Sequence, residues 1–165
     1  MPRGPDLTLA GYFGGFAPIG ERVGGFDIAL IENGEPVLGV IHAPVLAKTY
    51  YAAKGEGAFV NTAGETRPIQ VAKPGDTVRV VGSRSHPSPD LAGYLAQFAQ
   101  HEMVPVGSSL KFCLVAEGSA DVYPRFGPTM QWDTGAGHII ATEAGASVSF
   151  DGIASQVYQR ENLRN

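Results

Sequence analysis

Two apolar runs joined by a short polar turn constrain the fold more than any other feature of this chain. Residues 26–31 and 36–41 are largely apolar, and the polar stretch 32–35 between them contains Asn33 and Gly34. Both of these residues tolerate the positive φ angles of a tight turn, so an Asn-Gly pair between apolar runs indicates a β-hairpin. We expect the hairpin to begin an antiparallel meander with three further strands, at 48–52, 58–60 and 68–71.

The second half of the chain alternates strand and helix signals. Strands are expected at 78–81, 103–106, 121–123 and 147–150, and helices at 89–98, 109–117 and 133–144. Strands that alternate with helices predict a layered α/β fold. We therefore divide the chain into an irregular N-terminal stretch (1–25), a partial N-terminal sheet (26–74) and a C-terminal α/β domain (75–165), which would carry the substrate and metal site.

The composition limits which binding partners and which cellular compartment are expected for this chain. The formal net charge of -4 gives no general attraction to nucleic acid, so no nucleic-acid partner is expected. No apolar run approaches the roughly 18 residues that a membrane span needs, so no integral membrane segment is expected either. The single cysteine, Cys113, lies in an apolar run, which favours a buried structural thiol and suits a reducing cytoplasm. Peripheral association with the inner membrane remains open.

The segment 132–138 carries the most chemical information. It places one carboxylate, Asp133, at the start of a helix rich in small residues. A helix N-terminus suits phosphate, and a carboxylate beside it can hold a divalent cation that bridges to the same phosphate. Gly135, Ala136 and Gly137 have no bulk to keep a ligand or a neighbouring backbone away. The structural alternative is that Asp133 is an ordinary helix N-cap.

Several hydroxyl and basic side chains lie where strands are expected to end or helices to begin, the usual place for ligands in such folds. They are Arg84, His86, Ser108, Ser109, Lys111 and Arg125. Each has a structural alternative: Ser108 or Ser109 could merely cap the helix, and His86 could be a surface turn residue. His138 lies inside a helix and is discounted as a metal ligand. Together, these groups and Asp133 favour a phosphorylated ligand and a metal.

The motif Trp132-Asp133-x-x-Ala136-Gly137 resembles the C-terminal signature of the inositol monophosphatase-like, metal-dependent phosphatases. The stretches 107–118 and 120–129 are similar to the bacterial 3′(2′),5′-bisphosphate nucleotidases within that family. Those enzymes remove the 3′-phosphate from adenosine 3′,5′-bisphosphate, a by-product of sulfate assimilation, to give AMP and phosphate. The resemblance covers residue 26 to the end of the chain.

The resemblance implies a layered α-β-α fold, of which this chain would hold the C-terminal α/β domain and the last strands of the N-terminal sheet. It implies that Asp133 is a catalytic residue and a ligand of Mg²⁺, with Trp132 packed behind the metal. Ser108, Ser109 and Lys111 would bind a nucleotide bisphosphate, and Arg84, His86 and Arg125 are weaker candidates for the same role.

The chain also departs from the family pattern. The Asp-Pro-x-Asp-Gly-Thr motif, which supplies most of the family's metal ligands, has no counterpart in residues 1–25, where Asp6 and Glu21 are the only acids. One carboxylate cannot balance two divalent cations, so we expect an N-terminally truncated member with impaired activity. The first alternative is a catalytically inactive remnant that binds nucleotide or self-associates through its uncovered sheet. The second is an inositol or sugar phosphate phosphatase.

Overall fold

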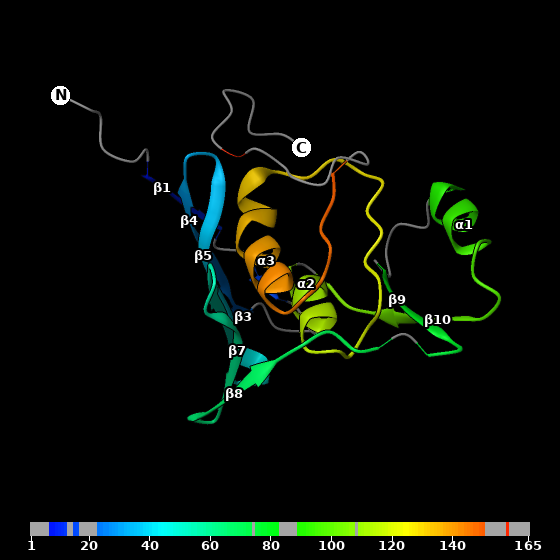
Figure 1. Ribbon diagram of the computed structural model, residues 1–165, viewed down its shortest axis with the longest axis horizontal. Helices are drawn as coiled ribbons and strands as arrows, with labels where there is room; N and C mark the ends of the chain where they lie inside the picture. Colours follow the sequence, from blue (N-terminus) through cyan, green and yellow to red (C-terminus); the bar gives the residue numbers. More distant parts are fainter. Residues whose placement is uncertain are drawn as a thin grey trace.

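The computed structural model describes residues 7–12, 15–16, 23–73, 75–82, 89–107, 109–150 and 158. Within these residues, six strands form one antiparallel sheet in the order β1-β4-β5-β6-β7-β8 (Figure 1). The strands are β1 (Leu7–Tyr12), β4 (Phe26–Glu32), β5 (Glu35–Ala43), β6 (Lys48–Ala53), β7 (Gly57–Thr62) and β8 (Glu65–Ile69). The predicted meander is confirmed.

The β4–β5 hairpin turns at Asn33 and Gly34, whose φ angles are 51° and 84°. Positive φ at both central residues is the turn that an Asn-Gly pair favours, which confirms the sequence-based prediction. At the opposite end of β5, the chain passes to β6 through a single 3-10 turn, η1 (Pro44–Leu46).

The prediction that residues 1–25 are irregular is wrong for the strands that the structure places there. β1 pairs antiparallel with β4, from Leu7 opposite Glu32 to Tyr12 opposite Asp27. β2 (Gly15–Phe16) and β3 (Val23–Gly24) form a second, short pair. Without β1, the backbone groups along one edge of β4 would have no partner, and the six residues LTLAGY are short enough to be obscured by the surrounding Gly and Pro.

Helices and a small parallel sheet complete the layers. The helices α2 (Leu110–Ala116) and α3 (Gln131–Glu143) lie against one face of the large sheet (Figure 1). Beyond them lie β9 (Val78–Gly82), β10 (His101–Pro105) and α1 (Pro89–Leu95), with β9 and β10 parallel. None of the described helices is long and apolar enough to cross a membrane.

The strand predicted at 147–150 is wrong, because residues 147–149 form no strand. The strand predicted at 121–123 is also wrong, because only Val122 forms a bridge, to Val80. Asp121 instead turns its side chain onto Arg79, accepting hydrogen bonds from the backbone N–H at 2.7 Å and from Nη2 at 2.7 Å. Because the backbone N–H of Arg79 in β9 donates to the Asp121 carboxylate, it cannot donate to a backbone carbonyl of residues 121–123. The pairing between β9 and this segment therefore stops at a single bridge.

Close packing of α3 onto the sheet depends on small residues. A Cβ atom at Gly39 of β5 would lie 2.5 Å from Cγ2 of Ile139 and 2.7 Å from the carbonyl oxygen of Ala136. A Cβ atom at Gly137 would lie 2.4 Å from the ring of Phe112 in α2. The small residues of this segment therefore admit a neighbouring strand and a neighbouring helix, as the sequence allowed.

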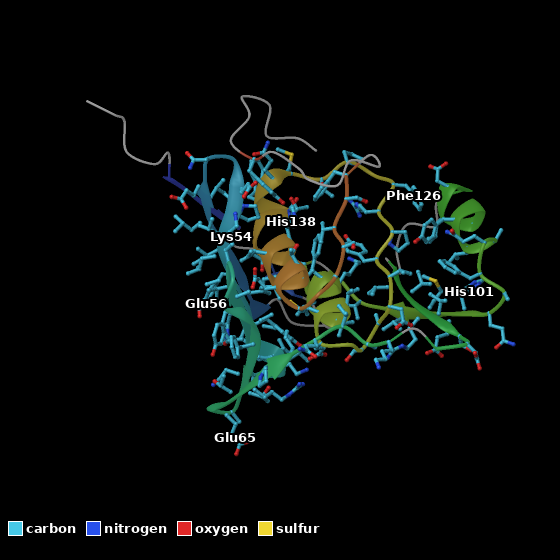
Figure 2. All side chains as sticks on the ribbon, in the orientation of Figure 1. Lys54, Glu56, Glu65, His101, Phe126 and His138 are labelled. Carbon is cyan, nitrogen blue, oxygen red and sulfur yellow. The ribbon has the colours of Figure 1, made fainter. Side chains whose placement is uncertain are left out.

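The two faces of the large sheet differ. The inner face carries the buried core, with side chains such as Ile31, Ile41, Tyr50 and Val60 packed beneath α2 and α3. On the outer face, a row in register across four strands is only partly buried. It consists of Ile28, Val40, Tyr51 and Phe59. No described helix lies over this face, which Lys54 and Glu56 border at the β6–β7 turn (Figure 2).

Candidate functional site

Asp133 lies in the first turn of α3 but is not its N-cap. The helix begins at Gln131, so Asp133 is its third residue, and its Oδ2 accepts a hydrogen bond from the backbone N–H of Met130 at 3.2 Å. The N-cap alternative is therefore wrong in detail: Met130 is the N-cap residue, and the Asp133 carboxylate accepts a hydrogen bond from its backbone N–H. A carboxylate can accept about four hydrogen bonds, so Asp133, which is partly exposed, retains the capacity to bind a ligand.

A second carboxylate, Asp27, lies beside Asp133, and the sequence analysis did not single it out. Asp27 shares the inward face of β4 with Ala29 and Ile31 and is only 3% exposed. Burial raises the pKa of Asp27 to about 6; the Ser109 hydroxyl opposes this rise, and the negative charge of Asp133 adds to it. One strand and the first turns of two helices thus bring these three side chains together.

Two buried polar atoms in this group have no hydrogen-bond partner among the described residues: Oδ1 of Asp27 and Oγ of Ser109. Ser109 is 7% exposed and occupies the N-cap position of α2, but its side chain makes no cap hydrogen bond, so its hydroxyl does not serve as a helix cap. An unsatisfied buried polar group costs roughly 1–3 kcal/mol, and more when it is charged. The folded protein therefore tolerates a local loss of stability at Asp27 and Ser109, which is typical of a ligand site.

Lys111 and Arg125 supply positive charge to the same region. Lys111 is buried, and burial and the charge of Arg125 lower its pKa; its Nζ lies 5.5 Å from the centroid of the Tyr123 ring. Arg125 is exposed and donates hydrogen bonds to the carbonyl oxygens of Gly127 and Pro128 at 3.2 Å and 3.1 Å. Burial raises the pKa of Tyr123; the charge of Arg125 opposes this rise and that of Asp133 adds to it, so Tyr123 is coupled to both a cation and a carboxylate of this region.

Other predicted site residues fall elsewhere. Arg84, His86 and Ser108 lie outside the described residues, so their roles remain predictions. His138 is packed and hydrogen-bonded: its Nδ1 lies 3.0 Å from the hydroxyl of Tyr158 (Figure 2 labels His138). Cys113 is fully buried, and burial raises the pKa of its thiol, which confirms it as a structural residue.

The donors at this site suit a hard cation. Asp27, Asp133 and Ser109 offer two carboxylates and a hydroxyl, the oxygen ligands that Mg²⁺ and Ca²⁺ prefer. Among the described residues, no three His, Cys, Asp or Glu side chains gather as a metal-binding group. Two carboxylates balance the charge of one divalent ion, so this set fits a single ion with water in its remaining positions. It does not fit a pair of adjacent ions.

Asp27 had a recognisable signal. The run 26–31 looks apolar as a whole, but side chains on a strand alternate between faces, and Asp27 falls on the same face as Ala29 and Ile31. An acid on the buried face of a strand requires a partner, which marks it as a candidate. Its proximity to Asp133 depends on the tertiary fold.

Comparisons with known proteins agree with this geometry. Residues 25–154 match the model of the inositol monophosphatase family. The 3′(2′),5′-bisphosphate nucleotidase CysQ of Salmonella typhimurium is 52% identical over 142 residues, which cover 84% of this chain and 56% of that protein. The chain spans about half the length of the curated relatives it matches.

Solved structures show the same likeness. CysQ from Bacteroides thetaiotaomicron, described as a bacterial member of the inositol monophosphatase family, is 40% identical with a TM-score of 0.77. The match covers 86% of this chain and 60% of that one. An inositol monophosphatase from Anabaena is 30% identical with a TM-score of 0.62, over 74% of this chain and 50% of that one. The predicted layered α/β fold is confirmed.

Proposed function

The chain belongs to the inositol monophosphatase family, and we propose on this premise that it is a magnesium-dependent phosphomonoesterase. The proposed reaction removes the 3′-phosphate of adenosine 3′,5′-bisphosphate and yields AMP and phosphate. The relatives named as bisphosphate nucleotidases support this substrate. The observation that carries the proposal is the meeting of Asp133, Asp27 and Ser109 where α2 and α3 begin.

Each residue has a role that follows from its chemistry. Asp133, with its carboxylate in the first turn of α3, would hold the magnesium ion. When bound, the ion neutralises charge on phosphate oxygens and lowers the pKa of a bound water. Lys111 and Arg125 supply positive charge that attracts and orients a phosphorylated ligand. In the same proposal, Ser108, Ser109, Arg84 and His86 contact the nucleotide.

We expect the activity to be low. The two carboxylates described at the site balance one divalent ion, whereas a pair of metals that stabilises both attacking and leaving oxygens carries four positive charges. Slow hydrolysis supported by a single ion is therefore the expected behaviour of this chain.

Phosphate release from adenosine 3′,5′-bisphosphate with and without Mg²⁺ tests the proposal. We expect slow, magnesium-dependent release that falls at least about tenfold in Asp133→Ala, because this change removes a metal ligand. The exposed Asp76→Asn variant is the matched control and should keep the wild-type rate. Release that persists unchanged in Asp133→Ala, or no release from the folded wild type, would contradict the proposal.

An inositol or sugar phosphate phosphatase is the second candidate activity, and the likeness to the inositol monophosphatase from Anabaena favours it. The same assay with inositol 1-phosphate separates the two. A higher kcat/KM for inositol 1-phosphate than for the nucleotide would favour this candidate. The basic pair Lys111 and Arg125 favours the bisphosphate, since two phosphates carry more negative charge than one.

An interaction role rests on the outer face of the large sheet. Leu38, Val40, Tyr51 and Phe59 line an apolar hollow there, and Leu38 is 39% exposed. Apolar faces of this kind favour association, and we propose that a second copy of the chain packs on it. Sedimentation should show a dimer that Tyr51→Lys dissociates, while the exposed Glu65→Lys control leaves it intact. A wild-type monomer at high concentration would exclude the dimer.

Two broader assignments also stand as proposals. The first is the boundary at residues 74/75 between the partial N-terminal sheet and the C-terminal α/β domain; the boundary at 25/26 does not stand, because β1 belongs to the same sheet as β4. The second is a cytoplasmic location, which the single buried thiol Cys113 suits.

A further inference from the structure

We propose that Asp27 of β4 is a cation ligand that shares one divalent ion with Asp133 and Ser109. This inference takes only one point from the proposed function, namely that Asp133 is a metal ligand. Its tests measure cation binding rather than turnover, so its failure and the failure of the proposed activity are distinguishable.

The fold places Asp27 at the start of both helices. On the inward face of β4, Asp27, Ala29 and Ile31 follow one another along the strand, and α3 runs over the same face. A Cβ atom at Gly39, the residue of β5 opposite Ala29, would lie 2.7 Å from the carbonyl oxygen of Ala136. Asp133 lies three residues before Ala136 and so shares its face of α3, the face that packs on this part of the sheet. The electrostatic coupling of Asp27 and Asp133 agrees with this placement.

Asp27 is a buried acid whose Oδ1 has no donor in the described part of the chain. Within the described ranges, the influences on its ionisation are burial, the Ser109 hydroxyl and the Asp133 carboxylate, and no described Lys or Arg is among them. Burying an ionised carboxylate beside another carboxylate is unfavourable, and either a proton or a bound cation relieves the repulsion. The unpaired Oγ of Ser109 offers a third oxygen at the same place.

The chemistry of these donors selects the class of ion. Two carboxylates and a hydroxyl are hard oxygen ligands, which suit Mg²⁺, Mn²⁺ and Ca²⁺ better than the softer metals that prefer thiolate or imidazole. Their combined charge balances one divalent ion. Water or a phosphate oxygen of the substrate would complete its coordination, which is how Mg²⁺ is usually bound.

The chain contains its own reporter for this ion. Trp132 is the single tryptophan and precedes Asp133 in the sequence. Terbium, a hard cation that emits when a nearby tryptophan is excited, can therefore be titrated into the full chain and displaced with Mg²⁺. We expect sensitised emission from the wild type, and at least about tenfold weaker binding of both ions in Asp27→Asn and in Asp133→Asn.

The controls separate a lost ligand from a lost fold. Asp27→Asn is nearly isosteric and removes a buried charge, so its circular dichroism without cation should match the wild type. Asp76→Asn, which changes an exposed acid, should leave the affinity unchanged. If Asp27→Asn does not fold, Ser109→Ala decides: a severalfold weaker affinity supports the inference, and an unchanged affinity overturns it.

Two other results would overturn the inference. One is an Asp27→Asn variant that binds terbium and Mg²⁺ as tightly as the wild type does. If Asp133→Asn alone abolishes binding in that case, the proposed function survives and the role of Asp27 does not. The other is a folded wild type that binds neither ion.

Discussion

Two buried carboxylates at opposite ends of α2 have contrasting surroundings. Glu117, just beyond the C-terminal end, has a side chain that is 5% exposed; it accepts hydrogen bonds from Nζ of Lys48 and from the hydroxyl of Tyr50, both at 3.0 Å. Ser119 donates to its other oxygen at 3.0 Å. Asp27, near the N-terminal end, is 3% exposed and has an oxygen with no partner among the described residues.

The difference lies in the source of the positive charge. Glu117 is neutralised by a lysine of the chain itself, so the pair links α2 to β6 and serves the fold. Asp27 is coupled to a hydroxyl and a second carboxylate, and none of the described residues supplies positive charge to it, so a bound cation is one source of the charge that would stabilise it. Burial alone therefore does not distinguish a structural acid from a ligand-binding one; the partners do.

The largest expected effect is on the paired acid. Glu117→Ala leaves the Lys48 ammonium and the Tyr50 hydroxyl without their acceptor, and we expect a loss of about 3 kcal/mol in the free energy of unfolding. Urea denaturation measures this loss. Replacing both partners, as Lys48→Met with Glu117→Leu, should restore part of it. A loss below about 1 kcal/mol for Glu117→Ala would show that the pair contributes little.

The unpaired acid should make stability depend on pH in the opposite sense to a salt-bridged one. Folding raises the pKa of Asp27 from 3.8 to about 6, so the native state holds the proton more tightly than the unfolded state. The contribution of Asp27 to the free energy of unfolding is therefore fully present below pH 4. It is lost as the pH rises through 6, by about 2–3 kcal/mol in total. Asp27→Asn should lack this decline, and the difference between the two unfolding curves isolates it. Parallel curves would contradict the burial of an ionised Asp27.

The packing that brings α3 to the sheet should tolerate no added methyl group. Gly39→Ala places Cβ against backbone atoms of Ala136, so we expect a loss of about 2 kcal/mol and weaker cation binding, because α3 must move away. Gly75→Ala is the matched control, since nothing lies within 4 Å of its added Cβ. Equal stability of the two variants, measured by thermal unfolding, would contradict the close approach.

The smallest effect is expected for an exposed ion pair. Nζ of Lys54 lies 2.6 Å from Oε2 of Glu35, but the two side chains are 59% and 62% exposed. Water screens such pairs, so Lys54→Ala should leave the urea midpoint unchanged within error. A clear shift in the midpoint would mean that exposure is a poor guide to the strength of these contacts.

Local signals in the sequence predicted much of the fold. The Asn33-Gly34 turn indicated the hairpin, and the helices predicted at 109–117 and 133–144 correspond to α2 and α3, which Gly118 and Gly145 follow with φ angles of 75° and 95°. The sequence missed β1, whose six residues gain their order by pairing with β4. It also predicted a strand at 121–123, where the Asp121 side chain binds Arg79 instead.

The candidate site was predictable only in part. Asp133 stood out because a carboxylate at a helix start suits a metal and a phosphate, whereas Asp27 was hidden in a run that looks apolar. The burial of Asp27 can be predicted from the alternation of faces along β4. Its neighbours Ser109 and Asp133 cannot be predicted in this way, because only the packing of α2 and α3 brings them close to it. The partnerless Oδ1 of Asp27 is likewise a property of the fold.

The most direct test compares the thermal unfolding of three proteins at pH 7, with and without Mg²⁺. We predict that Mg²⁺ at about ten times its Kd raises the midpoint of the wild type by roughly 3–5 °C. Glu117→Gln should start lower and show the same rise, whereas Asp27→Asn should start no lower than the wild type and show none. A full magnesium-dependent rise in Asp27→Asn would contradict the account.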